Sequence, residues 1–214
     1  MRKSTILIIT LLFIFVISAS GWYYSRLYSK NNVAKIFPKT TDSTTIAKVI
    51  KLNAHIRLLA QRVNNKYNTD WGFFIDMSIE SGKKRFFVVD LTHQKIIDSG
   101  LVTHGRCNEN WLSGRKYSNE VGGGCTSLGI YKIGNSYNGR FGLAYKLYGL
   151  DSTNSNAFQR FVVLHSMECI PEKECFPYPI CQSDGCPSVS PGFLKKLQVL
   201  LDSSSKPVLL YIYE

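Results

Sequence analysis

Residues 161–189 read FVVLHSMECIPEKECFPYPICQSDGCPSV and hold the most distinctive pattern of the chain. An apolar run typical of a buried strand ends at His165, and a loop then leads to Cys186 in a turn of small residues. The folded chain can bring such a pair together, so that the imidazole activates the thiol as a nucleophile. Gly185 leaves room beside the sulfur for a substrate carbonyl to reach backbone N–H groups. The stretch therefore predicts a cysteine acyl-transfer site.

The pair His165-Ser166 and the motif at residues 183–187 together resemble the signature of L,D-transpeptidases, the cysteine enzymes that cross-link bacterial peptidoglycan. Further motifs fit the YkuD-like branch of murein L,D-transpeptidase catalytic domain proteins, and they occur in its order. They are FID at 74–76, KRFFVVDL at 84–91, VTHGR at 102–106, YSNE at 117–120, TSLGIY at 126–131 and YNG at 137–139. The resemblance runs from Trp71 to Glu214. It implies a β-sandwich with the active site at one end and no metal or organic cofactor.

The same resemblance assigns roles to individual residues. Cys186 would be the nucleophile and His165 the base, with the backbone carbonyl of Ser166 orienting the imidazole. Ser183 would shape the nucleophile turn, and Gly185 with the N–H of Cys186 would form the oxyanion hole. The residues placed along the substrate cleft are His104, Gly105, Arg106, Tyr117, Ser118, Asn119, Ser127 and Gly129. Arg106 would suit a substrate carboxylate, although an ordinary surface arginine fits the sequence equally well.

Two residues of the nucleophile turn depart from the family pattern. Asp184 stands where relatives often carry histidine or tryptophan, and Gln182 replaces a frequent arginine. A carboxylate beside the thiol opposes its ionisation, which weakens the nucleophile. Cysteine spacing also raises a zinc site as an alternative, but only Cys181 and Cys186 come close to the spacing of a structural zinc pair.

The N-terminal residues predict export. Basic residues at positions 2 and 3 precede an apolar run at 6–17 and small residues at 18–20, the order of a secretory signal. Aromatic residues at 22–24 would suit a membrane interface, so residues 1–21 are either a cleaved signal peptide or a retained anchor. Residues 22–43 would be a tether. We expect a periplasmic or cell-envelope protein, with contact to the inner membrane through residues 6–19 if the segment is kept.

Six cysteines in an exported protein favour disulfides. If Cys186 is a free nucleophile, five cysteines remain, and at least one of them is unpaired. We expect one disulfide within the loop 169–181 and one that joins Cys107 to Cys125, although the sequence leaves the connectivity open. A disulfide between Cys181 and Cys186 would block the nucleophile.

Composition and spacing of apolar residues predict one mainly β domain with an extension. The 214 residues are 44% hydrophobic and carry a net charge of +11, which favours anionic partners such as a wall polymer. The basic residues are spread without a nucleic-acid motif, so nucleic acid is excluded, and a monomer is expected. Predicted strands lie at residues 72–79, 85–91, 95–102, 126–133, 143–150, 161–165 and 207–213, with one late helix at 191–202.

These elements predict a β-sandwich or partly closed barrel at residues 71–214. Ahead of it, apolar residues at helical spacing predict an amphipathic helix at 44–66 that packs on the domain. His55, on this helix, is interpreted as a surface residue.

Three functions follow from the sequence. The first is L,D-transpeptidation of peptidoglycan stem peptides through a Cys186 thioester. The second is an L,D-carboxypeptidase, in which water takes the acyl group. The third is a catalytically silent wall-binding protein, in which Asp184 and the cysteine cluster have turned the site into a disulfide-stapled surface.

Overall fold

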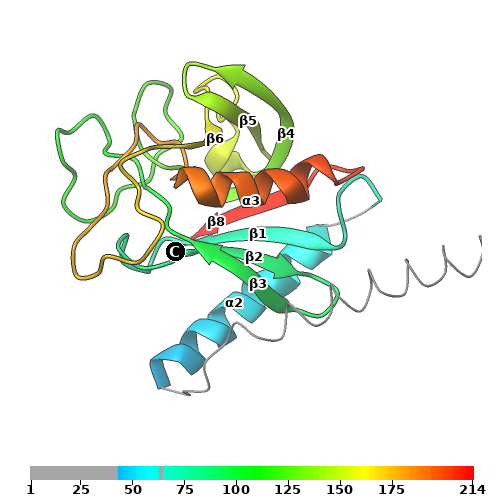
Figure 1. The fold of residues 1–214 in the computed structure, drawn as a ribbon. Coiled ribbons are helices and arrows are strands. Elements are labelled where there is room, and N and C mark those ends of the chain that lie inside the picture. The colour runs from blue at the N-terminus through cyan, green and yellow to red at the C-terminus, as the bar shows by residue number, and fades with distance from the viewer. Residues whose placement is uncertain (1–42, 63–64) are drawn as a thin grey trace, which may run out of the picture. The chain divides into compact units, whose positions relative to one another are not determined.

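The computed structural model describes residues 43–62 and 65–214 (Figure 1). The predicted export segment and nearly all of the predicted tether lie outside these residues. Within the described ranges, no helix has the length and the hydropathy of a membrane span.

Eight strands form one unclosed sheet in the order β3-β2-β1-β8-β4-β5-β6-β7, so the predicted mainly β fold is confirmed (Figure 1). The strands are β1 (Trp71–Asp76), β2 (Phe86–Asp90), β3 (Lys95–Gly100), β4 (Gly129–Gly139), β5 (Gly142–Gly149), β6 (Val163–Ser166), β7 (Ser188–Val189) and β8 (Leu209–Tyr213). The described helices are α2 (Ser43–Arg62), α3 (Pro191–Asp202) and the short 3-10 helix η1 (Ser152–Asn154). The late helix α3 has the predicted bounds, because Ser190 caps its first turn and Pro191 has no N–H to satisfy there.

Strand β8 joins the two halves of the sheet. It pairs in parallel with β1 and antiparallel with β4, so that Leu210 lies between Phe73 and Tyr131. Both faces of β8 are covered, which explains its nearly continuous apolar sequence, LLYIY.

The core lies on both faces of the sheet, with one helix over each. Neighbouring residues of a strand point to opposite faces, and Phe73 and Phe74 accordingly belong to different apolar clusters. The first cluster includes Phe193, Leu194 and Leu197 of α3, which crosses the sheet in Figure 1. The second includes Leu52, Ile56 and Leu59 of α2.

Strand β4 runs farther than predicted, and strand β7 was not predicted. Strand β4 continues to Gly139 although its apolar alternation stops at Ile133, because its ladder with β5 passes an irregularity and runs on into a solvent-exposed hairpin. Strand β7 has only two residues and pairs with β6, which is too short a run for a sequence signal.

Helix α2 ends at Arg62 rather than at residue 66, and His55 is not a surface residue. The His55 ring stacks on Tyr213 with the centroids 3.6 Å apart and meets the ring of Tyr211 edge-on. Burial lowers the pKa of His55, and the neighbouring charge of Lys51 lowers it further. A neutral imidazole therefore forms part of the packing between α2 and β8.

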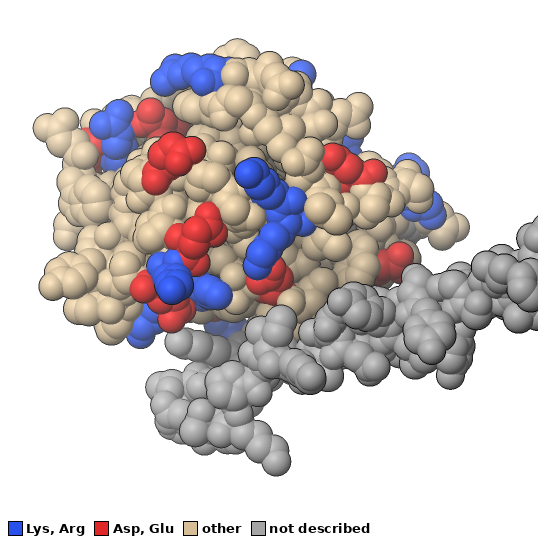
Figure 2. Space-filling model, in the orientation of Figure 1, with Lys and Arg blue, Asp and Glu red and all other residues tan. Residues whose placement is uncertain are grey.

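Charge on the face that Figure 2 shows is mixed. Lysine and arginine side chains are interspersed with aspartate and glutamate there and do not gather in one basic field.

We expect Leu59→Ala to destabilise the protein by about 2–5 kcal/mol, because it empties a fully buried site between α2 and β1. The neighbouring Leu58 is 48% exposed and supplies the matched control, since Leu58→Ala should change stability by less than about 0.5 kcal/mol. Urea unfolding of both variants measures the difference. Equal losses would mean that α2 does not pack on the sheet through Leu59.

Candidate active site

Cys186 and His165 line one cavity of about 410 Å³. His165 comes from β6, and Cys186 comes from the loop that leads into β7. Because β6 and β7 pair in parallel with His165 opposite Ser188, the pairing brings the loop cysteine beside the strand histidine. The other residues of the cavity wall are Arg106, Asn110, Trp111, Arg140, Phe141, Met167, Cys181, Gln182, Ser183 and Asp184.

The imidazole of His165 is buried and held from three sides. Nδ1 lies 2.9 Å from the Ser166 carbonyl oxygen, the contact expected for that residue, and Nε2 lies 2.9 Å from the Ser188 hydroxyl. The Phe141 ring stacks on the imidazole with the centroids 4.1 Å apart. A carbonyl only accepts, so Nδ1 carries the proton and Nε2 holds the lone pair.

Burial lowers the pKa of His165, and the hydrogen bond to the Ser166 carbonyl opposes this effect. A lowered pKa keeps the ring neutral near pH 7, which is the form that a general base needs. The hydroxyl of Ser188 occupies Nε2, and it can donate to the neutral ring or accept from the protonated one. Sequence analysis missed Ser188, because only the pairing of β6 with β7 brings it to the histidine.

The Cys186 thiol is free and partly buried. Its sulfur lies 3.9 Å from the Phe161 carbonyl oxygen. Burial raises the pKa of the thiol, a backbone hydrogen bond from Val163 and the charge of Arg160 lower it, and the Asp184 carboxylate raises it. Asp184 itself accepts a 2.7 Å hydrogen bond from Nε of Arg106, and this ion pair offsets the field of the carboxylate at the sulfur.

Ser183 shapes the nucleophile turn. Its hydroxyl donates to the Cys186 carbonyl at 2.7 Å and accepts from the Gly185 N–H at 3.2 Å. Gly185 has a φ of +105°, and a Cβ on it would lie 2.6 Å from the Cys125 carbonyl oxygen, so no other residue fits there. Since Ser183 occupies the Gly185 N–H, the N–H of Cys186 is the better candidate for binding an oxyanion.

Arg160 ties the cleft walls to this turn, and sequence analysis did not single it out. Its guanidinium donates to the carbonyl oxygens of Ser118, at 2.8 Å, and Cys125, and to the Ser127 hydroxyl. A Cβ on Gly185 would lie 3.1 Å from the Arg160 Nη2 atom, so the cation lies against the nucleophile turn. An isolated arginine after a polar run carries no sequence signal for this role.

His104 lies in a second cavity, of about 210 Å³, which adjoins the first at Trp111 and Gln182. Its Nδ1 is 3.1 Å from Nη2 of Arg85, a fully buried guanidinium. Burial and the charges of Arg85 and Arg115 lower the pKa of His104 to about 4. His104 is therefore neutral, and its contact with Arg85 makes it part of the framework behind the cleft.

Of the other predicted cleft residues, Arg106 lines the first cavity, and three more support its walls. The Gly105 N–H donates to the Thr126 hydroxyl, and Ser127 and Ser118 accept hydrogen bonds from Arg160. The remaining three lie farther from the cavity. Tyr117 packs against the core, Asn119 forms hydrogen bonds with the segment 152–156, and Gly129 begins β4.

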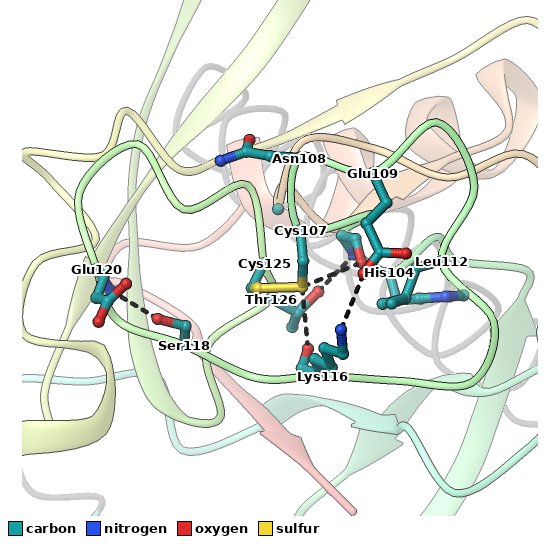
Figure 3. The surroundings of a disulfide bond; sticks show 12 residues. His104, Cys107, Asn108, Glu109, Leu112, Lys116, Ser118, Glu120, Cys125 and Thr126 are labelled. Atoms are coloured by element: carbon teal, nitrogen blue, oxygen red, sulfur yellow. Dashed lines mark hydrogen bonds and ion pairs between the residues drawn. A yellow bond between two sulfur atoms is a disulfide. The ribbon is translucent and has the colours of Figure 1, made fainter.

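Both expected disulfides are present, and they leave Cys175 and Cys186 free. The bond between Cys107 and Cys125 closes the loop that carries several wall residues, and Lys116 pairs with Glu109 within it (Figure 3). Cys181 is bonded to Cys169, so it does not block the nucleophile. In the described part of the chain, no three histidine, cysteine, aspartate or glutamate side chains gather as metal ligands.

A protein-family model described as the L,D-transpeptidase catalytic domain matches residues 42–213. The chain belongs to the L,D-transpeptidase catalytic domain family. The match includes α2 and all eight strands, so it begins well before Trp71, where the resemblance in the sequence motifs started. A search of curated proteins finds no match.

Several solved structures are similar to this L,D-transpeptidase-family chain. An L,D-transpeptidase from Mycobacterium smegmatis has 11% identity, covers 68% of this chain and 59% of that chain, and gives a TM-score of 0.42. One from Xylanimonas cellulosilytica has 14% identity, with 73% and 68% coverage and a TM-score of 0.38. The helical cell shape determining protein Pgp2 from Campylobacter jejuni has 13% identity, with 78% and 55% coverage and a TM-score of 0.39. The chain thus spans between 55% and 68% of the length of these proteins.

We expect Arg160→Gln to slow the alkylation of Cys186 by iodoacetamide several-fold near pH 7, because the lost cation raises the thiol pKa. The midpoint of the pH–rate profile should move upward. Arg160→Lys keeps the charge and should lie closer to wild type. A Cys175→Ser background removes the other free thiol.

An unchanged midpoint in Arg160→Gln would show that Arg160 only supports the fold. Circular dichroism of each variant provides the check on folding.

Proposed function

We propose that this protein is an exported cysteine acyltransferase that performs L,D-transpeptidation on peptidoglycan stem peptides. Membership of the L,D-transpeptidase family supports a peptidoglycan-modifying transpeptidase. The observation that carries the finer proposal is the shared cavity of Cys186 and His165, with the His165 tautomer set by the Ser166 carbonyl.

In this proposal, His165 takes the thiol proton through Nε2 and Cys186 attacks the carbonyl carbon between the L-centre of a diamino acid and the terminal D-residue. The oxyanion forms against the N–H of Cys186. The C–N bond then breaks as His165 returns the proton to the leaving amine, and a thioester remains. An amine of a neighbouring stem attacks the thioester, its proton passes to His165, and the thiol re-forms.

The Ser188 hydroxyl has to yield Nε2 to the thiol for the first proton transfer. Both groups come from the short segment 186–188, so a small shift of that turn exchanges one partner for the other. Catalytic hydrogen bonds often tighten only when substrate is bound. The cleft wall contributes Arg106 and Arg140 as cations for the carboxylates of a stem peptide.

The free thiol of Cys186 favours an enzyme over a disulfide-stapled binding protein. Whether an amine or water takes the acyl group distinguishes transpeptidase from L,D-carboxypeptidase, and the products decide it. We further propose that residues 1–21 direct export or anchor the protein, that residues 22–43 form a tether, and that the domain acts as a monomer in the periplasm or cell envelope.

We expect the purified protein to convert disaccharide-tetrapeptide muropeptides to cross-linked dimers, detected by mass spectrometry. Cys186→Ala should abolish the products, and His165→Ala should slow them by roughly 10²–10⁴-fold, because each removes a partner in proton transfer or attack. Cys175→Ser removes the other free thiol and should leave activity intact. Tripeptides in place of dimers would indicate a carboxypeptidase.

The proposal fails if the wild-type protein does not convert the substrate, either as purified or after mild reduction of the protein. It fails equally if Cys186→Ala retains the products.

A further inference from the structure

Three exposed aromatic rings gather beside the nucleophile on a surface that the catalytic steps above do not use. Tyr137 of β4 is 37% exposed, and Phe158 and Phe161, in the turn before β6, are 55% and 84% exposed. They line a shallow cavity of about 100 Å³ together with Lys146 and the buried floor of Leu147, Val162 and Val163. We call Tyr137, Lys146, Phe158 and Phe161 the aromatic platform; Tyr137 and Lys146 belong to the paired strands β4 and β5, which Figure 1 labels.

Phe161 occupies a backbone position where glycine is usual. Its φ is +55°, its N–H donates to the Phe158 carbonyl, and the next N–H, of Val162, donates to the Ala157 carbonyl. This pair of bonds is the Schellman pattern, whose left-handed residue is most often glycine because a bulky side chain is strained there. The ring also gains almost no burial. Neither the turn nor the core therefore accounts for a phenylalanine at this position.

The backbone of the platform adjoins the nucleophile, and the two cavities have no lining residue in common. The carbonyl oxygen of Phe161 lies 3.9 Å from the Cys186 sulfur. Val163, in the platform floor, begins the strand that carries His165. The platform is therefore within reach of a polymer that places one branch at Cys186.

One face of the Phe158 ring stacks on Tyr148 with the centroids 5.4 Å apart, which leaves Phe161 as the most exposed ring of the platform. Lys146 Nζ lies 5.6 Å from the Tyr137 ring centroid and 6.0 Å from that of Phe158, so an ammonium group lies between two rings. The cavity of about 100 Å³ is too small for a helix. This combination suits a flat group with one apolar face and hydroxyl or carboxylate oxygens at its edge.

We propose that the aromatic platform binds the glycan strand of peptidoglycan while the attached stem peptide enters the cleft at Cys186. The C–H faces of sugar rings stack on Phe158, Phe161 and Tyr137, and Lys146 donates to their oxygens. This inference rests on the proposed function, which assigns the cleft to stem peptides. The platform would bind the glycan polymer that carries those peptides. A membrane surface or a second copy of the chain would need a broader apolar area than these separate rings provide.

The test measures binding of the full chain, as its Cys186→Ala variant, to glycan strands from which an amidase has removed the stem peptides. We expect binding, weakened roughly tenfold in Phe158→Ala and in Phe161→Gly. Phe161→Gly is the sharper variant, because glycine suits the left-handed turn and should hold or raise the melting temperature while binding falls. Phe176→Ala is the matched control, since Phe176 is 51% exposed, lies under Lys83 and is outside the platform.

The proposal is overturned if stripped strands do not bind, if Phe161→Gly binds them as well as the parent, or if Phe176→Ala loses as much. It is also overturned if the platform variants change only binding to anionic vesicles or only self-association in sedimentation. Binding without chemistry keeps the two proposals apart. If the protein binds stripped strands but has no cross-linking activity, the platform proposal holds and the proposed function fails. If it cross-links muropeptides but does not bind stripped strands, the proposed function holds and the platform proposal fails.

Discussion

The pairing of β8 with β1 on one side and β4 on the other is the constraint on which the rest of the structure depends. Among the named strands of the described residues, no other pairing joins β1–β3 to β4–β7, although an isolated bridge between Val102 and Val189 links the segment after β3 to β7. The partners are far apart in sequence, so their contact carries a loop-closure cost that local hydrogen bonds do not offset. Burial on both faces supplies the compensation, because β8 is covered by the α3 cluster on one side and the α2 cluster on the other.

The candidate site lies on the second half of this sheet and depends on arginine side chains and neutral imidazoles. Three arginines have separate tasks: Arg85 holds His104 behind the cleft, Arg106 neutralises Asp184, and Arg160 lies against the nucleophile turn. His104 and His165 both have lowered pKa values through burial, yet only His165 reaches the cavity of the thiol. Distance and hydrogen-bond partners, more than residue type, thus separate a candidate base from a framework residue.

The disulfides and the glycine turn confine the cleft without contributing chemistry. The Cys107–Cys125 bond places the Cys125 carbonyl under Gly185, where any side chain would collide with it. The carbonyl oxygen of Phe161 lies 3.9 Å from the sulfur while the Phe161 ring is exposed to solvent. The proposed peptide cleft and the proposed glycan platform therefore both adjoin the Cys186 thiol. A branched polymer substrate requires two such neighbouring sites.

Features with a local cause followed from the sequence alone: the bounds of α3, which begins at Pro191, a strand that carries His165, and the small-residue turn at Cys186. The sequence left the cysteine connectivity open, and the fold decided it. Tertiary structure decided what depends on register and on partners distant in sequence. Ser188 meets His165 only because β7 pairs in parallel with β6, and Arg160 reaches the nucleophile turn only through the fold of the loop 118–127. The exposure of Phe161 could not be predicted from the sequence, because an apolar residue at the start of an apolar run predicts burial. In the structure, Phe161 lies in a left-handed turn and its ring is exposed to solvent.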